Sequence, residues 1–539
     1  MGELLQAMGE KQLIEDEDES CAVCKNAAKQ KCSACKSVYY CSRDHQKSHW
    51  KIHSRNCRPF KLAENSTLGR HYVATRRIEP GELVLREKTP LVAAPPQGTP
   101  PVCLNCYVAL TVDDSKPCGK CGWPLCLECT EHGPECEFTI EHRKSKVAIT
   151  EYGFPHPTYR AIGVIRALAL RDADPEAYRT LMSLEDHCVE AARQPNSLDM
   201  PVDVAGFVKR FFKVEDAEEA EIAKIVGILQ INGHEVPTTE TPHVAVYDVA
   251  SYLEHDCRAN CSKSFTDNGG IVIRAAVPIS KGDHISICYT DPLWGVTNRR
   301  HHLAQTKFFE CMCERCRDPT EFGTMFNAVR CVKESCGGYM LPPLFIVCGE
   351  EFPNFVCRKC SATTSWDAIE RMQENIGMEL SAMKKEDADA CRKFIESQAR
   401  VLHENHFYNV DVKLALAQII GQQEGGLPAV SDELLSEKIM LCKKLSELLR
   451  TLVPAENRVR GVVLFEMHAS IAEFGRRQGP DALRGLLIES KKVLAESYQL
   501  LRHEPEILPE GKIARQAQKN LREIDIIIQT LLQNTASPT

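Results

Sequence analysis

Three short segments between Asp248 and Cys316 decide how this chain folds. They read Glu254-His-Asp-Cys257-Arg-Ala-Asn260, then Ile285-Ser-Ile-Cys-Tyr289-Thr-Asp, then Phe308-Phe-Glu-Cys311-Met-Cys313-Glu-Arg-Cys316. The second segment has the apolar pattern of a strand that ends in a tyrosine. The third segment spaces its cysteines as zinc thiolates are spaced, but it holds no fourth ligand nearby. A complete tetrahedral site therefore needs a ligand from another part of the chain.

These segments resemble the carboxy-terminal half of a SET domain, the fold of most protein-lysine methyltransferases. In that family the first segment reads Asn-His-Ser-Cys-x-Pro-Asn. The His, the Cys and the final Asn match here, whereas the leading Asn, the Ser and the Pro do not. The resemblance implies that Cys257 is the missing ligand, which gives one zinc site of Cys257, Cys311, Cys313 and Cys316. Such a zinc would staple the closing segment to the pocket.

The same resemblance implies S-adenosylmethionine as the cofactor and Tyr289 as the catalytic tyrosine. The methyl group passes from a sulfonium to a neutral amine, so the enzyme must desolvate the substrate lysine. A tyrosine hydroxyl and nearby carbonyls then align the methyl group. Two alternatives stay open: His255 as a structural residue, and Tyr289 as a merely buried strand residue. The implied cofactor contacts are Gly69, Asn232, Glu254, His255, Tyr289 and Phe309.

Three residues depart from the family pattern in this pocket. His71 replaces the second glycine of a loop that lets the backbone approach the cofactor. Glu254 replaces an Asn, and a buried carboxylate there must find a donor or take up a proton. Lys307 stands where the family has a tyrosine of its lysine channel, and a cation in that channel would repel a substrate ammonium.

The departures leave two functional hypotheses. The first is an S-adenosylmethionine-dependent protein-lysine methyltransferase that acts on histone or non-histone proteins in chromatin and transcription regulation. The second is a catalytically weak or inactive SET scaffold that recruits corepressors through its zinc fingers. Restoring Asn at position 254 and Tyr at position 307 raises activity only if the rest of the pocket is intact.

Eight metal ligands precede the pocket, in a segment too short to bury a core of its own. With Tyr39-Tyr-Cys41-Ser and Trp50, the segment resembles a MYND zinc finger. The finger is either a structural knob or, as the resemblance implies, a surface that binds proline-rich corepressor peptides, including those of deacetylase complexes. The resemblance assigns Cys21, Cys24, Cys41 and His45 to one zinc, and Cys32, Cys35, His53 and Cys57 to the other.

Two further cysteine-rich segments follow. The first holds enough ligands for two zinc ions: Cys103, Cys106, Cys118, Cys121, Cys126, Cys129, His132 and Cys136. A second zinc module of this kind inside a SET domain, with Cys-Gly122-Trp-Pro124, resembles the arthropod-specific branch of the SET and MYND domain family. The second segment has the pattern of a zinc ribbon, with Cys331, Cys336, Cys357 and Cys360. The predicted total is about six zinc ions.

Hydrophobic periodicity predicts the elements around these sites. Residues 68–75 and 78–85 have the pattern of one β-hairpin, and residues 271–278 and 284–289 the pattern of another. Helical spacing covers residues 161–170, 174–192 and 202–231.

From Trp366 onward the chain has the pattern of amphipathic helices, with Ser431 as a candidate helix cap. This tail resembles the TPR-like carboxy-terminal domain of the same family. No clean repeat of about 34 residues is present, so a helical stack is better supported than a true TPR array.

The fold class that follows is a multi-domain α+β protein. A β-rich SET domain carries zinc-finger (MYND) modules, a post-SET zinc site, a zinc-ribbon-like insert and an α-helical TPR-like domain. The predicted domains are a disordered acidic amino terminus (1–20), a MYND finger (21–57), the SET amino-terminal part (58–102), a second, divergent MYND-like insert (103–136), a helical insert (137–231), the SET core (232–291), a post-SET zinc segment (292–320), a zinc-ribbon-like segment (321–365) and the TPR-like domain (366–539).

Charge and composition exclude several functions. The formal net charge is −8, and it falls to about −17 if 21 cysteine ligands are thiolates on six Zn²⁺ ions. An acidic chain without a basic stripe disfavours DNA and suits a basic protein target, such as a lysine-rich histone tail. The first twenty residues lack a signal-peptide core, and no apolar stretch approaches the ~18 residues of a membrane span. Localisation in the nucleus and the cytoplasm is expected from the resemblance alone.

Overall fold

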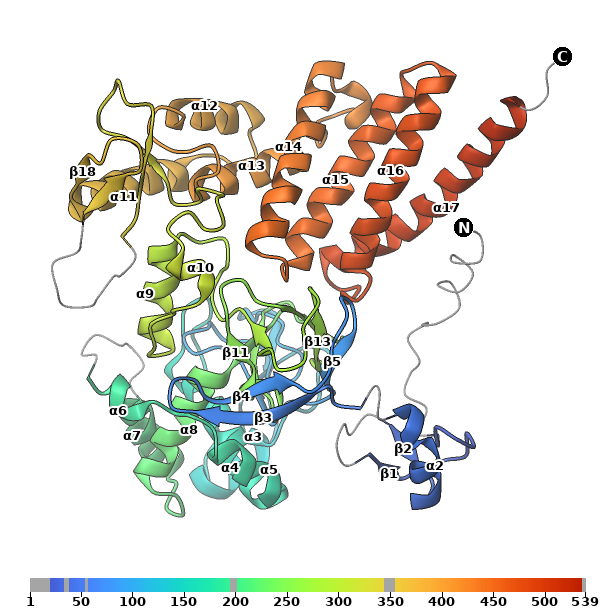
Figure 1. Cartoon of the computed structure of the whole chain (residues 1–539). Helices are drawn as coiled ribbons and strands as arrows, with labels where there is room; N and C mark the ends of the chain where they lie inside the picture. Colours follow the sequence, from blue (N-terminus) through green and yellow to red (C-terminus); the bar gives the residue numbers. More distant parts are fainter. Residues whose placement is uncertain (1–19, 33–37, 54–56, 194–200, 344–353, 536–539) are drawn as a thin grey trace.

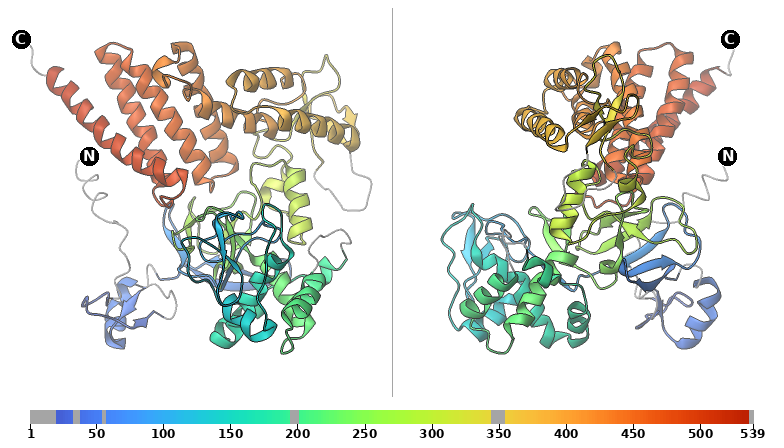
Figure 2. Two further views of the ribbon diagram at one scale, coloured as in Figure 1. Left: turned by 180° about the vertical axis from the view of Figure 1, so that it is seen from behind. Right: turned by 60° about the vertical axis from the view of Figure 1, so that its left-hand side comes forward.

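The computed structural model describes residues 20–32, 38–53, 57–193, 201–343 and 354–535. Figure 1 shows a central β core with a small finger at its side, a helical insert below it and a stack of long helices above it. In Figure 2 the finger and the helical insert lie on different sides of the β core. The architecture is the multi-domain α+β arrangement that the sequence predicts.

The β core is assembled from strands that are far apart in the sequence. Its main sheet has the order β12-β13-β5, with β5 at Leu83–Glu87, β12 at Cys261–Phe265 and β13 at Ile271–Ala275. Beside it, β3 (Phe60–Asn65) pairs with β4 (Gly69–Ala74). Side chains from these strands form one apolar cluster.

Both predicted β-hairpins are wrong. Strand β4 pairs with β3 instead of β5, and β13 pairs with β12 and β5 instead of the segment at 284–289. Within the described residues, isolated bridges instead link the region of the first predicted hairpin to that of the second, Val73 to His284 and Ile78 to Ile279. A Pro-Gly turn reverses the chain locally, but the longer edges of distant strands decide which ladders form.

Two smaller β elements complete the core around the pocket segments. Strands β6 (Val92–Ala94), β10 (His243–Val246) and β9 (His234–Val236) form an antiparallel sheet in that order. Strand β11 (Glu254–His255) pairs in parallel with β14 (Ser286–Ile287). The Asn260 side chain fixes this register, because its Nδ2 donates to the carbonyl of His284 at 2.7 Å and its Oδ1 accepts from the amide of Ser286 at 3.0 Å.

The insert between β6 and β9 has its own core, which includes Trp123 and helix α4. It begins with β7 (Ser115–Pro117) and β8 (Pro124–Cys126), which pair with each other, and the short α3 (Glu135–Phe138). The predicted long helices are broken into shorter ones. The helices are α4 (Ile162–Ala173), α5 (Pro175–Met182), α6 (Cys188–Ala191), α7 (Pro201–Phe212) and α8 (Glu219–Asn232).

Helix α5 begins where the sequence predicts a helix start. Asp174 accepts from the amides of Glu176 and Ala177, and Pro175 occupies the first helical turn. A capping carboxylate followed by proline starts a new helix. The breaks that the sequence did not predict lie after Met182 and between Phe212 and Glu219.

The finger and the post-SET region are small units, and each contains clusters of candidate metal ligands. In the finger, β1 (Gln30–Lys31) and β2 (Tyr39–Tyr40) pair ahead of α2 (Arg43–His53). After the β core come α9 (Val296–Thr306) and α10 (Glu314–Arg317). A four-stranded sheet then follows, made of β15 (Val329–Arg330), β16 (Tyr339–Leu341), β17 (Phe355–Cys357) and β18 (Thr363–Thr364).

The carboxy-terminal region is a stack of helices. They are α11 (Trp366–Ala382), α12 (Ala388–Gln398), α13 (Phe407–Ile419), α14 (Asp432–Leu452), α15 (Asn457–Arg476), α16 (Pro480–Leu501) and α17 (Pro509–Thr535). Ser431 accepts from the amide of Leu434 at 3.3 Å and so caps α14 as the sequence predicts. None of the described helices is both long and apolar enough to cross a membrane.

Candidate active site and zinc centres

The predicted metal ligands come together in groups of four. In each group the ligand atoms lie within 4.8 Å of one another, and thiolates with imidazole are the donors that zinc prefers. Of the second finger site, Cys35 lies outside the described residues, while Cys32 and Cys57 have their sulfurs 3.7 Å apart and His53 is buried. The groups are Cys21, Cys24, Cys41 and His45; Cys103, Cys106, Cys126 and Cys129; Cys118, Cys121, His132 and Cys136; Cys257, Cys311, Cys313 and Cys316; and Cys331, Cys336, Cys357 and Cys360.

The insert cluster settles a pairing that the sequence left open. Its ligands interleave, so that the pairs 103/106 and 126/129 form one group and the pairs 118/121 and 132/136 form the other. His132 places its Nε2 3.1 Å from the sulfur of Cys121, and its Nδ1 donates to Glu135 Oε1 at 2.8 Å. A carboxylate behind a histidine ligand fixes the ring and its tautomer.

Arg166 on α4 holds this carboxylate from the other side. Its Nε donates to Glu135 Oε2 at 2.7 Å, and its guanidinium also donates to the carbonyls of Ala93 and Leu104. Burial alone would raise the pKa of Glu135, but His132 and Arg166 lower it to about 2. Sequence reasoning missed Glu135 and Arg166, although a Glu three residues after a predicted ligand on a helix was a usable signal.

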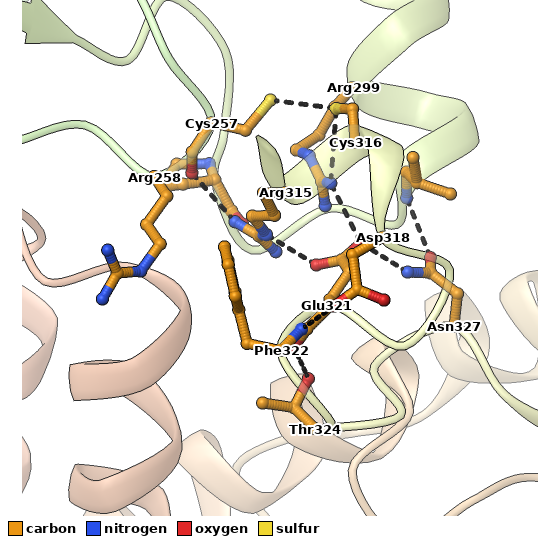
Figure 3. Close-up of polar contacts among 12 residues, drawn as sticks. Cys257, Arg258, Arg299, Arg315, Cys316, Asp318, Glu321, Phe322, Thr324 and Asn327 are labelled. Carbon is orange, nitrogen blue, oxygen red and sulfur yellow. Dashed lines mark hydrogen bonds and ion pairs between the residues drawn. The ribbon is translucent and has the colours of Figure 1, made fainter. Parts of the chain in front are cut away.

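The post-SET cluster joins the pocket segment to the closing segment. The sulfur of Cys257 lies 3.5 Å from that of Cys316 and 3.9 Å from that of Cys311. Arg299 of α9, which is fully buried, directs its Nη2 toward the Cys316 sulfur at 3.8 Å (Figure 3). Four thiolates on one Zn²⁺ leave a net charge of about −2, and the guanidinium offsets part of it.

A buried carboxylate binds two arginines behind this cluster (Figure 3). Glu321 accepts from Arg299 Nη2 at 2.9 Å and from Arg315 Nε at 2.5 Å, and Asn327 donates to it as well. Arg315 also donates to the carbonyl of Cys257 at 3.0 Å. Burial would raise the pKa of Glu321, but the two guanidinium groups hold it below its usual range.

These contacts extend to the helical stack through Arg258, the residue that follows Cys257. Arg258 donates from its Nε to the carbonyl of Thr451 on α14 at 2.7 Å. This hydrogen bond joins the segment that carries Cys257 to helix α14.

Tyr289 lies at the centre of the candidate active site. Its hydroxyl donates to the carbonyl of Leu253, the residue just before β11. Burial, and secondarily the charge of Glu254, raises the pKa of Tyr289 above its usual value, so the hydroxyl stays protonated as a donor.

His255 connects Tyr289 to the zinc cluster. Its Nδ1 accepts the backbone N–H of Tyr289 at 3.0 Å, so the ring proton lies on Nε2, which is 3.3 Å from the sulfur of Cys257. Burial lowers its pKa to about 4, which keeps the imidazole neutral. The ring centroid lies 5.4 Å from that of Tyr289 and 5.8 Å from that of Phe309. Its two ring nitrogens are thus used in structural contacts, as the structural alternative for His255 requires, and its ring lies beside those of Tyr289 and Phe309.

Two of the three departures compensate each other. Glu254 Oε2 accepts from His284 Nδ1 at 2.8 Å, and the ring of His284 stacks on that of His71 at 4.7 Å. His71 in turn donates from Nδ1 to the carbonyl of Gly69 at 3.0 Å. The carboxylate thus has its donor, and the chain Glu254–His284–His71 links two predicted cofactor contacts, Gly69 and Glu254.

The remaining predicted cofactor residue, Asn232, ends helix α8. Its Nδ2 donates to the carbonyls of Glu185 at 2.8 Å and Ile228 at 2.9 Å. Lys307 lies beside it, with Nζ donating to the carbonyls of Ile231 at 2.8 Å and Gln230 at 3.2 Å. The ammonium therefore caps a helix end, which the sequence could not show.

These positions fit the group that the family implies. The neutral rings of His255, Tyr289 and Phe309 offer apolar faces to the adenine of the cofactor. Methyl transfer from a sulfonium requires no metal ion, so none of these residues has to be a metal ligand. Gly69 is linked to Glu254 through His71 and His284. The Asn232 end of α8 is linked to the Phe309 segment through Lys307. The residues present are thus suited to S-adenosylmethionine.

The chain matches the family model of the MYND finger over residues 21–57 and that of the SET domain over residues 69–290. It is 28% identical over 290 residues to SET domain-containing protein SmydA-8, isoform A, of Drosophila melanogaster, covering 52% of this chain and 61% of the fly protein. The chain therefore has a MYND finger and a SET domain, the pair of domains after which the SET and MYND domain-containing proteins are named. The fly relative supports the arthropod-specific branch of this family.

Other relatives of the family are more distant. Histone-lysine N-methyltransferase ASHR1 of Arabidopsis thaliana is 22% identical over 329 residues, which is 57% of this chain and 65% of the plant protein. The chain thus spans less than two thirds of the length of each of these two relatives. Among solved structures, the SET domain of LSMT bound to methyllysine and AdoHcy aligns with 92% of this chain and 96% of its own, with 12% identity and a TM-score of 0.30.

Proposed function

We propose that this SET and MYND domain protein is an S-adenosylmethionine-dependent protein-lysine methyltransferase. The observation that carries the proposal is the placement of Tyr289, whose hydroxyl meets the Leu253 carbonyl beside the rings of His255 and Phe309. A hydroxyl and a carbonyl at one point, in an apolar surrounding, suit the alignment of a methyl group between sulfur and nitrogen.

Each pocket residue has a part in this mechanism. Phe309 and the face of His255 would hold the aromatic part of the cofactor, and Gly69, Glu254 and Asn232 its polar end. The bound cofactor supplies an electrophilic methyl group on sulfur. Tyr289 and the Leu253 carbonyl orient the reacting atoms, while the buried surround excludes water and favours the neutral amine of the substrate lysine.

The substrate class follows from charge. The chain is acidic, with a formal charge of −8 before metal binding. A basic protein segment, such as a histone tail or a lysine-rich region of a non-histone protein, complements this charge. The plant relative is named a histone-lysine N-methyltransferase, which supports histones as the first substrates to test. A role in transcription, in the nucleus and the cytoplasm, extends this proposal.

The finger favours a second function, the recruitment of partner proteins. Trp50 is 48% exposed and Ile52 65% exposed, both on helix α2 of the finger. Solvent-facing aromatic and aliphatic side chains on a rigid, metal-held unit suit a proline-rich peptide of a corepressor. Because three pocket residues depart from the family pattern and the finger exposes this surface, a weakly catalytic scaffold is the competing function.

Calorimetric titration of the zinc-replete protein with S-adenosylmethionine and S-adenosylhomocysteine is the test. Micromolar binding, followed by methyl transfer to histone peptides that Tyr289→Phe abolishes, is the expected result. A folded, fully metallated sample that binds neither ligand contradicts the methyltransferase and leaves the scaffold. Trp50→Ala, which touches no pocket residue, is the matched control for peptide recruitment by the finger.

A further inference from the structure

Glu87, the last residue of strand β5, contacts the turn that leads into the candidate active site. Its Oε1 accepts the backbone N–H of Val249 at 3.0 Å and that of Ala250 at 2.6 Å. A 3₁₀ turn covers Ala250–Tyr252. The first N–H groups of such a turn have no partner within it, so an acceptor from outside has to satisfy them. Here that acceptor comes from a strand of the main sheet, 163 residues earlier in the chain.

A continuous path of hydrogen bonds runs from this carboxyl group to the candidate catalytic tyrosine. The carbonyl of Ala250 accepts the N–H of Leu253 at 3.1 Å. The carbonyl of Leu253 in turn accepts the hydroxyl of Tyr289. That carbonyl and that hydroxyl are the two groups to which the proposed function assigns the alignment of the methyl group. Glu87 is therefore connected to them through two residues, Ala250 and Leu253.

Apolar packing alone does not determine how this turn is oriented. Ala250 and Leu253 are each 1% exposed and belong to the apolar cluster of the β core. Packing of this kind is non-directional, whereas a hydrogen bond constrains the direction of the group that donates it. Ser251 makes a second side-chain contact in the turn, from its Oγ to the carbonyl of Tyr247 at 2.6 Å. This contact runs back along the chain, so the path to Leu253 depends on Glu87.

The role of Glu87 requires an acceptor rather than a negative charge. Burial raises its pKa to about 7, although both backbone amides favour the ionised form. A substantial part of the population is then protonated at neutral pH, and the carbonyl oxygen of a protonated carboxyl group still accepts hydrogen bonds. A neutral acceptor of the same length should therefore hold the turn as well.

We propose that Glu87 is a positioning residue of the methyl-transfer site, which orients the Leu253 carbonyl by holding the turn at Ala250–Tyr252. The inference rests on the proposed methyltransferase function. Glu87 acts through the backbone and takes no part in the chemical step. A displaced Leu253 carbonyl would move the acceptor of the Tyr289 hydroxyl, and a displacement of ~1 Å in such a site can lower the rate about 100-fold.

Three substitutions test this role in the full-length, zinc-replete protein. Glu87→Gln keeps the length and the acceptor, Glu87→Asp keeps the acceptor but withdraws it by one methylene, and Glu87→Met keeps the length without an acceptor. Calorimetry with S-adenosylhomocysteine counts the cofactor sites and gives their affinity, and single-turnover methyl transfer to a histone peptide gives the rate per site. We expect Glu87→Gln to stay within about threefold of the wild-type rate per site. Glu87→Asp and Glu87→Met should lose about 10–100-fold, with cofactor affinity changed less than about twofold.

Ser251→Ala is the matched control and should keep the wild-type rate per site, because it removes the other contact of the turn without breaking the path to Leu253. A purely structural role of Glu87 would lower the number of cofactor sites and leave the rate at each remaining site unchanged. That result, or a wild-type rate per site in Glu87→Asp, overturns this inference alone. If Glu87→Met does not fold, Glu87→Asp and Glu87→Gln still decide. A wild-type protein that binds no cofactor contradicts the proposed function itself.

Discussion

Two of the zinc centres each contact a buried arginine–glutamate ion pair, but a different member of the pair faces the metal ligands. At the post-SET centre the guanidinium of Arg299 faces the sulfur of Cys316, and Glu321 lies behind it. At the insert centre Glu135 faces the ligand His132, and Arg166 lies behind it.

The difference follows the charge of each centre. Four thiolates on Zn²⁺ leave about −2, whereas three thiolates and a neutral histidine leave about −1. The more negative centre has a cation next to its sulfur, and the centre with a histidine has an acceptor for the ring N–H. The chain therefore matches its buried ion pairs to the ligand set, and the following four experiments test that match.

Removing a ligand of the post-SET centre should have the largest effect. Cys257→Ala should lose one zinc ion per chain, and with it on the order of 10 kcal/mol of metal-binding free energy that helps to hold the closing segment. Metal analysis by mass spectrometry measures the loss. Cys442→Ala, a fully buried cysteine outside the clusters, is the control and should keep every ion. An unchanged zinc count in Cys257→Ala would rule out the assigned ligand set.

Neutralising Glu321 should come next. Glu321→Gln leaves Arg299 and Arg315 buried without their counter-charge, which costs about 3–5 kcal/mol. Urea denaturation followed by tryptophan fluorescence measures the shift in the midpoint. Glu79→Gln removes an exposed pair with Arg77 and should change stability by less than about 1 kcal/mol. Equal shifts for the two variants would show that the buried pairs do not support the zinc centre.

The insert centre should respond more weakly. Glu135→Gln keeps the shape but weakens the acceptor behind His132, and loss of such a partner typically lowers metal affinity about 10–100-fold. Competition with a chelator, read as the zinc released from the protein, measures the change. Glu137→Gln, exposed on the same helix, is the matched control. If both variants release zinc equally, the carboxylate has no role in metal binding.

The smallest effect concerns pH, and it has opposite signs at two buried carboxylates. Glu87 accepts from the amides of Val249 and Ala250, and burial raises its pKa to about 7. Its folded state keeps the proton longer than the unfolded state, so stability falls as pH rises from about 4 to about 7. The pKa of Glu321 is lowered instead, so its contribution is present above the unfolded pKa of about 4 and is lost as pH falls.

Two variants separate these contributions. Glu87→Gln should remove most of the decline between pH 4 and pH 7, and Glu321→Gln should flatten the loss on the acid side. Denaturation midpoints measured across this range give both slopes. Parallel pH profiles for wild type and Glu87→Gln are the result that speaks against a raised pKa.

The sequence predicted the metal-binding scaffold better than the pocket. Cysteine spacing is local, so the cysteine pairs in the groups around Cys21 and Cys331 could be anticipated from it, whereas Cys257, far from Cys311 in the sequence, was supplied by the family resemblance. The supports at Arg299, Glu321 and Arg166 could not, because each joins segments that only the fold brings together.

The pocket departures show the same limit. In the sequence, Glu254 and His71 are two separate departures from the family pattern. In the structure, His284 contacts both of them. The sequence predicted Lys307 as a cation in a channel and a helix that ends at residue 231, but it could not show that Lys307 lies beside that helix end. The predicted hairpins failed for a related reason, since pairing partners depend on distant strands.

The sheet β12-β13-β5 determines when this protein can fold during synthesis. Ile271 pairs with Glu87, and the insert centres and helices α4 to α8 lie between them in the chain. At ~5–20 residues per second, the ribosome needs roughly 10–40 s to deliver the partner of β5. The insert, with its own core and metal ligands, can fold in that interval, so the exposed edge of β5 waits beside a finished module. The rate of translation thus sets the shortest time for which the unpaired edge of β5 is exposed to aggregation.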